Sequence, residues 1–189
     1  MAAERKRKVD RRTLYTKMEI KNAMLTLLGK KDYADITVAE LCREAELNRG
    51  TFYLHYNNTA QIIDELFDDA IGNMHSVLVQ LGSSAAADEK CAYPLCRFLR
   101  ENKQYQPLFF SDSLHGYAVE RLAQSDRDRY LSKLSETSSL SRDVLEEIFY
   151  FQLNGCLAVS RRNIGISDED WSRIQCGVDS FLRRGFENT

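Results

Sequence analysis

The scarcity of helix-breaking residues constrains this chain more than any other feature. Its 189 residues include only 2 prolines and 9 glycines, so long stretches can run without a residue that ends a helix. An all-β sandwich needs many short strands joined by tight turns, and this composition disfavours it. The 43% of hydrophobic residues are enough for a globular protein to build a core.

Helix starts can be located from a local pattern. Ser, Thr, Asn or Asp at the N-cap is followed three residues later by Glu or Gln, with apolar residues one before and four after. Thr37 and Asn58 begin such segments, and Thr16 either begins or reinforces the first helix. With the apolar period of 3.6 residues, the pattern predicts an all-α protein of about nine helices. The expected helices cover about residues 16–29, 37–45, 48–55, 58–81, 88–102, 104–111, 113–136, 141–163 and 167–186.

Charge is distributed unevenly along the chain. Residues 1–60 carry 12 basic and 8 acidic side chains, whereas residues 61–189 carry 14 and 20. Six cations lie within the first 12 residues, where there is no apolar periodicity: Arg5, Lys6, Arg7, Lys8, Arg11 and Arg12. This segment is either a solubilising tail or a flexible arm that seeks phosphates beside a DNA-binding unit.

The second and third expected helices are separated by only three residues, 46–48, which is the spacing of a helix-turn-helix. Phe52 and Tyr56 lie one turn apart and are expected to face the core. Arg49, Thr51, Tyr53 and His55 then point outward, and these residue types suit base edges and phosphate oxygens. Gly50 leaves room for a close approach of the backbone to DNA. The alternative is a helical hairpin with a solvated polar face.

The segment TVAELCREAELNRGTFYLHY, residues 37–56, resembles the DNA-binding signature of the TetR family of bacterial transcriptional regulators, and the resemblance extends over about residues 20–66. It implies an all-helical homodimer with an amino-terminal helix-turn-helix and a divergent carboxy-terminal domain that binds small ligands and dimerises through its last two helices. The DNA-binding candidates are Thr37, Asn48, Arg49, Gly50, Thr51, Tyr53, His55 and Thr59.

Two residues depart from the family pattern. Glu46 stands where the family usually has the turn glycine, so the turn needs a non-glycine solution or carries strain. Thr59 stands where a lysine is common at the start of the fourth helix, which removes one cation from the expected phosphate contacts. We expect three parts: a basic arm over residues 1–12, the helix-turn-helix domain over 13–57 and a ligand-binding and dimerisation domain over 58–189.

A second resemblance covers residues 93–102 and 108–112. These segments look like one carboxy-terminal subfamily, which is similar to a coactivator linked to dihydroxyacetone kinase. Such a protein need not bind DNA alone. A coregulator that acts through a protein partner is therefore the alternative to a DNA-binding regulator.

Aromatic and apolar stripes in the carboxy-terminal part suggest two further surfaces. Aromatic clusters interleaved with polar groups indicate either ordinary core or a pocket between helices. The candidate ligand-binding residues are Tyr105, Phe109, Phe110, Phe149, Gln152 and Cys156.

Apolar stripes with small residues on the last two helices predict a twofold dimer interface. Its candidate residues are Leu153, Gly155, Leu157, Val159, Ile174, Gly177, Val178, Phe181 and Leu182.

Other classes of protein find little support in the sequence. It contains no G-x-S-x-G, G-x-x-x-x-G-K or H-E-x-x-H motif, so we expect neither an enzyme nor a cofactor. A helical enzyme or binding module unrelated to DNA is kept as the third alternative. Five cysteines without C-x-x-C spacing predict reduced thiols and no metal site. Without an 18-residue apolar run or a signal peptide, we expect a cytoplasmic protein that does not contact membranes.

These observations predict a ligand-responsive transcriptional regulator. It would act as a homodimeric repressor on a pseudo-palindromic double-stranded operator, with an unidentified small molecule as effector. The effector would shift the population toward an arrangement in which the two reading heads no longer match the spacing of the operator.

Overall fold

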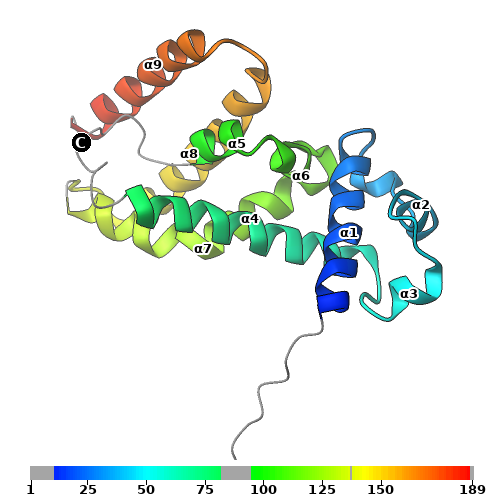
Figure 1. Ribbon diagram of the computed structural model, residues 1–189. Helices are drawn as coiled ribbons and strands as arrows, with labels where there is room; N and C mark the ends of the chain where they lie inside the picture. The colour runs from blue at the N-terminus through cyan, green and yellow to red at the C-terminus, as the bar shows by residue number, and fades with distance from the viewer. Residues whose placement is uncertain (1–10, 82–94, 137, 188–189) are drawn as a thin grey trace, which may run out of the picture. The chain divides into compact units, whose positions relative to one another are not determined.

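The computed structural model describes residues 11–81, 95–136 and 138–187 (Figure 1). Within these ranges there are nine α-helices and no strand, and four of the helices have 20 residues or more. The predicted all-α class and the predicted number of helices are therefore confirmed. The chain divides at Leu66 into two compact units, Met1–Leu66 and Phe67–Thr189, and each is described separately.

The first unit contains three helices and the start of a fourth. These are α1 (Arg11–Leu28), α2 (Val38–Glu44), α3 (Arg49–Tyr53) and the first turns of α4 (Thr59–Leu81). A 3-10 turn at Tyr33–Asp35 joins α1 to α2. Helix α2 packs against α1 and α3, so the short helices are held to the longest helix of the unit.

Helix α1 begins earlier than the cap pattern predicted. It starts at Arg11, and the Thr16 hydroxyl donates to the Arg12 carbonyl oxygen at 2.9 Å instead of capping a helix start. Arg11 and Arg12, expected in the flexible arm, therefore form part of the first turn of α1. The rest of that arm, residues 1–10, lies outside the described residues.

The core of the first unit is the apolar face expected from the helical period. Helix α1 buries Ile20, Ala23, Met24, Leu27 and Leu28. Apolar side chains elsewhere in the unit are also buried, namely Leu41, Phe52, Tyr56, Ile62, Ile63 and Leu66, each at most 2% exposed. Burying a side chain of this size contributes about 1.5–3 kcal/mol, and this burial holds helices that are too short to be stable alone.

A capping box fixes the start of α2, as the sequence predicted. The Thr37 hydroxyl accepts from the Glu40 backbone N–H at 3.3 Å, and the Glu40 carboxylate accepts from the Thr37 N–H at 3.1 Å. Hydrogen bonds from Lys31 and from Thr37 lower the pKa of Glu40 to about 2. The Glu40 carboxylate is therefore charged at neutral pH.

An ion pair ties α1 to the start of α4. The Glu65 carboxylate accepts from Lys17 Nζ at 2.5 Å and from the Tyr56 hydroxyl at 2.9 Å, and the Lys17 ammonium lies 4.9 Å from the centre of the Tyr56 ring. Burial raises the pKa of Glu65, but the hydrogen bonds from Lys17 and Tyr56 outweigh it and hold that pKa below its usual value. The charged carboxylate is thus the form that the fold stabilises.

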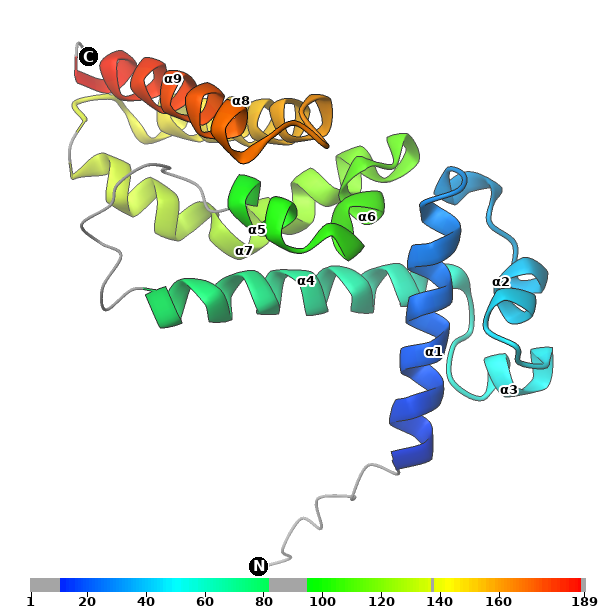
Figure 2. The same cartoon turned by 45° about the horizontal axis from the view of Figure 1, so that its top comes forward.

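The second unit is a bundle of the remaining helices (Figure 2). Its elements beyond α4 are α5 (Leu95–Glu101), α6 (Gln106–Phe110), α7 (His115–Ser135), α8 (Arg142–Arg162) and α9 (Asp168–Glu187). Helix α8 packs against α7, α5 and α6. Where the residues are described, these bounds agree with the expected helices to within a few residues, and α5 is described from Leu95, directly after Pro94, which was expected either to kink that helix or to start its main portion. The expected linker and the proposed start of that helix, residues 82–94, lie outside the described residues.

Aromatic rings form much of the core of the second unit. Phe67 meets Phe109 edge to face with ring centres 5.2 Å apart, and Tyr130 packs on Phe149 at 4.9 Å. Leu95, Leu108 and Leu122 of the same unit are fully buried. None of the described helices is long and apolar enough to span a bilayer.

The network around Glu65 gives a test of the first unit. Replacing Glu65 by Ala removes the acceptor for Lys17 and Tyr56, and we expect the free energy of unfolding at neutral pH to fall by about 1 kcal/mol. Because the folded-state pKa lies below the unfolded value of about 4.5, the contribution is present above that pH and is lost as the pH falls through the folded pKa. Urea unfolding at several pH values measures both effects.

The matched control is Glu44→Ala, which breaks the exposed pair between Glu44 and Lys30 at 3.0 Å. We expect it to cost less than about 0.5 kcal/mol. An equal loss in both variants, or a Glu65→Ala difference that stays constant on acidification, would contradict the role assigned to Glu65.

Candidate functional site

The turn between α2 and α3 is the first part of the candidate DNA-binding site. The Leu47 N–H donates to the Cys42 carbonyl oxygen at 2.8 Å and the Glu46 N–H to that of Arg43 at 3.2 Å. These two bonds are those of a Schellman motif, which places the residue after the C-cap in the left-handed region. That residue is Glu46, with φ of +53°. The turn expected to need a glycine therefore forms with a strained glutamate.

Helix α3 is capped as the sequence predicted. The Asn48 side-chain oxygen accepts from the Thr51 N–H at 2.7 Å and from the Thr51 hydroxyl at 3.0 Å. A Cβ at Gly50 would lie 3.2 Å from this same oxygen. Gly50 thus leaves room for the cap within the protein, a reason that the sequence analysis did not identify.

The two faces of α3 differ as expected. Phe52 is 1% exposed and points into the core, and the following Tyr56 is also buried. On the opposite face, Arg49 is exposed and Tyr53 is 56% exposed, whereas Thr51 and His55 are half-buried. A guanidinium, a phenol and a hydroxyl on this face give donors and acceptors suited to base edges and phosphates.

Two further candidates lie at helix starts. Thr37 is exposed, and its hydroxyl also donates to the Glu40 carboxylate at 2.8 Å. Thr59 is half-buried at the first residue of α4, where its hydroxyl oxygen lies 3.1 Å from that of Tyr33. The Asn58 side chain caps α4 by accepting from the Gln61 N–H at 3.1 Å. Free backbone N–H groups at such starts favour anions.

The six ligand-binding candidates lie in several packing clusters of the second unit. Tyr105 stacks on Phe98, Phe109 meets Phe67, and Phe149 meets Tyr130. Gln152 accepts a hydrogen bond from Tyr130, and the Cys156 carbonyl oxygen accepts from the Cys96 thiol. Phe110 is the one candidate among the six that lines the pocket described next. The helical period indicated which rings face inward but not where space is left between them.

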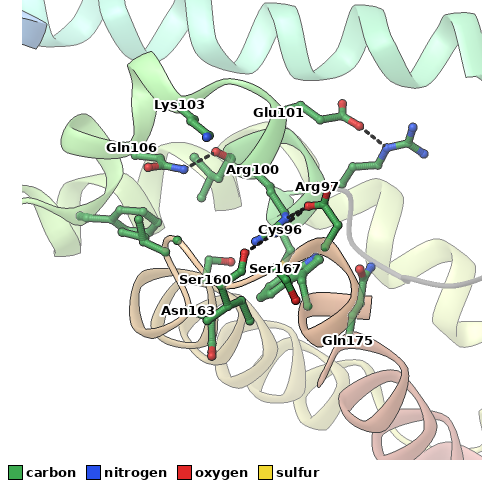
Figure 3. A pocket seen from close by; sticks show the side chains of 17 residues that line it. Cys96, Arg97, Arg100, Glu101, Lys103, Gln106, Ser160, Asn163, Ser167 and Gln175 are labelled. Carbon is green, nitrogen blue, oxygen red and sulfur yellow. Dashed lines mark hydrogen bonds and ion pairs between the residues drawn. The ribbon is translucent and has the colours of Figure 1, made fainter. Parts of the chain in front are cut away.

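A pocket of about 720 Å³ lies between α5, the start of α6, the end of α8 and the start of α9 (Figure 3). We call it the α5–α9 pocket. Its cations are Arg97, Arg100 and Lys103, its neutral polar groups include Ser160, Asn163, Ser167 and Gln175, and its apolar surface includes Phe110, Ile164 and Trp171. We did not predict this site from the sequence. The cations at positions 97, 100 and 103 lie three residues apart and were its available signal.

The dimer candidates fall into two groups. Leu153 and Leu157 on α8 are each 2% exposed and pack inside the unit, and Val159 packs against the buried Cys96, Cys156 and Trp171. On α9, by contrast, Phe181 is 73% exposed and Ile174, Val178 and Leu182 are half-buried. The exposed backbone positions are Gly155 and Gly177. The α9 stripe is therefore the part of the predicted surface that a second chain can reach.

The described cysteines are free thiols. Cys42, Cys96 and Cys156 are buried and Cys176 is exposed, while Cys91 lies outside the described residues. Burial raises the pKa of the Cys42 thiol against the opposing charge of Arg49. Across residues 11–81, 95–136 and 138–187, no three His, Cys, Asp or Glu side chains gather in a way that could hold a metal ion.

Comparison with known proteins finds a family match within the amino-terminal unit. Residues 20–66 match the bacterial regulatory proteins of the tetR family. The chain is also 34% identical over 64 residues to an uncharacterized HTH-type transcriptional regulator, YxbF, of Bacillus subtilis (strain 168). That alignment covers 33% of this chain and 17% of the relative. No solved structure matches the chain.

The strain at Glu46 gives a test of the turn. A non-glycine residue in the left-handed region destabilises the folded state by about 1–2 kcal/mol. Glycine removes this strain, but it lowers the stability by about 0.5–1 kcal/mol because it loses more conformational entropy on folding. We therefore expect Glu46→Gly to raise the free energy of unfolding by about 0.5–1 kcal/mol, as measured by urea denaturation. Glu46→Ala, which keeps a Cβ, should leave it nearly unchanged. An equal gain from alanine would show that the side chain, not the backbone, is responsible.

Proposed function

Because residues 20–66 are a helix-turn-helix domain of the TetR family of bacterial regulatory proteins, we propose that this protein is a DNA-binding transcriptional regulator. It acts as a homodimeric repressor on a pseudo-palindromic operator, and a small molecule bound in the second unit releases it from DNA. The Bacillus subtilis relative is named an HTH-type transcriptional regulator, and this name supports the same activity.

The exposed face of α3 is the observation that carries the proposal. Phe52 anchors the helix in the core, Asn48 fixes its start, and this leaves Arg49 and Tyr53 on the surface. In this arrangement Arg49 reads a guanine edge with two parallel hydrogen bonds, which is the commonest base-specific contact. Tyr53 and the half-buried His55 position the helix on phosphates.

The apolar stripe on α9 supports a dimer. Phe181 is exposed on the same helix that presents Ile174, Val178 and Leu182 at helical spacing, and Gly177 allows a close approach. A second copy covering this stripe by twofold symmetry removes a large apolar surface from water. Two reading heads related by that axis then match operator half-sites about one helical turn apart or a multiple of it.

A coregulator that acts through a protein partner is the second candidate, and Thr59 favours it. The residue carries no charge at the start of α4, and its hydroxyl is already within hydrogen-bond distance of Tyr33. The position therefore supplies less attraction for phosphate than a lysine would. Selection of bound duplexes from a random pool separates the candidates, because the coregulator enriches no sequence.

Arg49→Ala tests the reading face. We expect it to weaken binding to the selected operator by about 1–3 kcal/mol and to relax the preference at one base pair, measured by fluorescence anisotropy on matched and substituted duplexes. Arg173→Ala removes an exposed arginine of α9 whose ion partner is Asp170 and should leave affinity unchanged. Equal weakening of Arg49→Ala on every duplex would show that Arg49 contacts only phosphate.

Phe181→Asp tests the dimer. A carboxylate buried at the α9 stripe without a partner costs several kcal/mol, on the order of 3, so sedimentation velocity should show a shift toward monomer. Val144→Asp places the same charge at an exposed apolar position in the first turn of α8, outside the stripe, and should sediment like the unmodified protein. If Phe181→Asp still sediments as a dimer, the α9 stripe is not the dimer interface.

A further inference from the structure

The end of α3 carries an apolar side chain that the protein leaves almost fully exposed. Leu54 is 81% exposed, more than any other large hydrophobic residue in the described parts of the chain. We propose that Leu54 contacts the methyl group of a thymine in the operator and so selects a T·A pair at one position. This inference rests on the DNA binding proposed above, and it adds a residue that was not among the sequence candidates.

Backbone hydrogen bonds place Leu54 on the helix. It is the C-cap residue of α3, with φ of −72° and ψ of −21°, and its N–H donates to the Gly50 carbonyl oxygen at 3.2 Å. Leu54 therefore continues the helical geometry and lies one turn after Gly50, on the same face. Gly50 is exposed and has no side chain, so the preceding turn offers nothing that would cover the leucine.

The face that contains Leu54 is opposite the core. The buried residues Phe52 and Tyr56 lie two positions before and two positions after it, which is about 200° around an α-helix in either direction. Tyr53, by contrast, keeps its ring against Phe52, edge to face with ring centres 5.2 Å apart. Leu54 is thus the more exposed of the two neighbouring side chains and points away from the protein.

Thymine supplies the partner that this side chain can use. The edges of all four base pairs present hydrogen-bond donors and acceptors in the major groove, but only thymine also presents a methyl group there. The leucine side chain forms no hydrogen bonds, so it gains free energy only by removing apolar surface from water. Contact with the thymine methyl group does this, whereas contact with a phosphate does not.

The length of α3 lets both of its ends reach base edges. Five residues at 1.5 Å each make a helix about 7.5 Å long, which is shorter than the width of the major groove, about 12 Å. Leu54 follows Arg49 by five positions, or about 7.5 Å along the helix, which corresponds to about two base pairs at 3.4 Å each. We therefore expect the thymine about two base pairs from the guanine assigned to Arg49.

Arg49 also favours DNA over a protein as the partner of this face. It is exposed at the other end of α3 and forms no ion pair with a carboxylate in the parts of the chain that the structure describes. A free guanidinium and a leucine on one short helix match a surface that offers anionic phosphates, guanine edges and thymine methyl groups together.

Replacement of thymine by uracil tests the contact, because it removes the methyl group alone. The full-length protein is titrated by fluorescence anisotropy with the selected operator and with duplexes in which one thymine at a time is uracil. We expect one position at which uracil weakens binding about fourfold, since burial of one such carbon contributes about 0.8 kcal/mol. Leu54→Ala should bind the thymine and uracil duplexes at that position equally well.

Two further variants serve as controls. Leu14→Ala makes the same truncation at a leucine of α1 that is 55% exposed, and it should keep the fourfold preference for thymine. Leu54→Met retains an apolar side chain and should keep most of that preference. Because Leu54 is exposed, Leu54→Ala should unfold at the same urea concentration as the unmodified protein.

Three results would overturn the inference. The first is a selected operator in which no uracil weakens binding. The second is a uracil effect that is the same in Leu54→Ala and the unmodified protein, which assigns the methyl group to another side chain. In both cases operator selection, and with it the DNA-binding regulator, still stands. The third is a random pool that enriches no duplex, which overturns the regulator and the inference together.

Discussion

The burial of Phe52 is the interaction on which the candidate DNA-binding surface depends. Helix α3 has only five residues, and a helix of that length does not persist in water. Its conformation is fixed by the Phe52 ring in the core and by the Asn48 cap at its start. The outward direction of Arg49 and Tyr53 is thus a consequence of packing on the other face. A cavity under Phe52 would disorder the exposed face of α3 without altering any residue that we propose to contact DNA.

Charge serves different purposes in the two units. In the first, Glu65 joins Lys17 and Tyr56 and so connects α1 to the start of α4, which carries the Asn58 cap. In the second, Arg100 is held by Asp168 and by the backbone of Ile166, and this contact links α5 to the start of α9. The first arrangement holds the helix-turn-helix together, whereas the second shapes the wall of a pocket.

The sequence predicted best what depends on neighbouring residues. The caps at Thr37, Asn48 and Asn58 and the buried face of α1 follow from spacings of three or four positions, and all of them form. Thr16 shows the limit of this approach, because the same cap pattern lies inside a helix that starts earlier. The spacing of the cations at positions 97, 100 and 103 marks only one wall of the α5–α9 pocket, and the facing residue Asp168 is 68 residues away from Arg100, so the pocket itself did not follow from local spacing. The helical period also could not tell that Leu153 is covered within the unit while Phe181 is not.

A side chain at position 50 would affect the Asn48 cap, and through the cap the exposed face of α3. Because a Cβ at position 50 would lie 3.2 Å from the capping oxygen, a side chain there requires the Asn48 side chain to shift by a few tenths of an ångström. Arg49 and Tyr53 point away from this contact and are free of that coupling. Substitutions at the exposed positions 49 and 53 therefore leave the capping oxygen its room, whereas a side chain at position 50 displaces the cap.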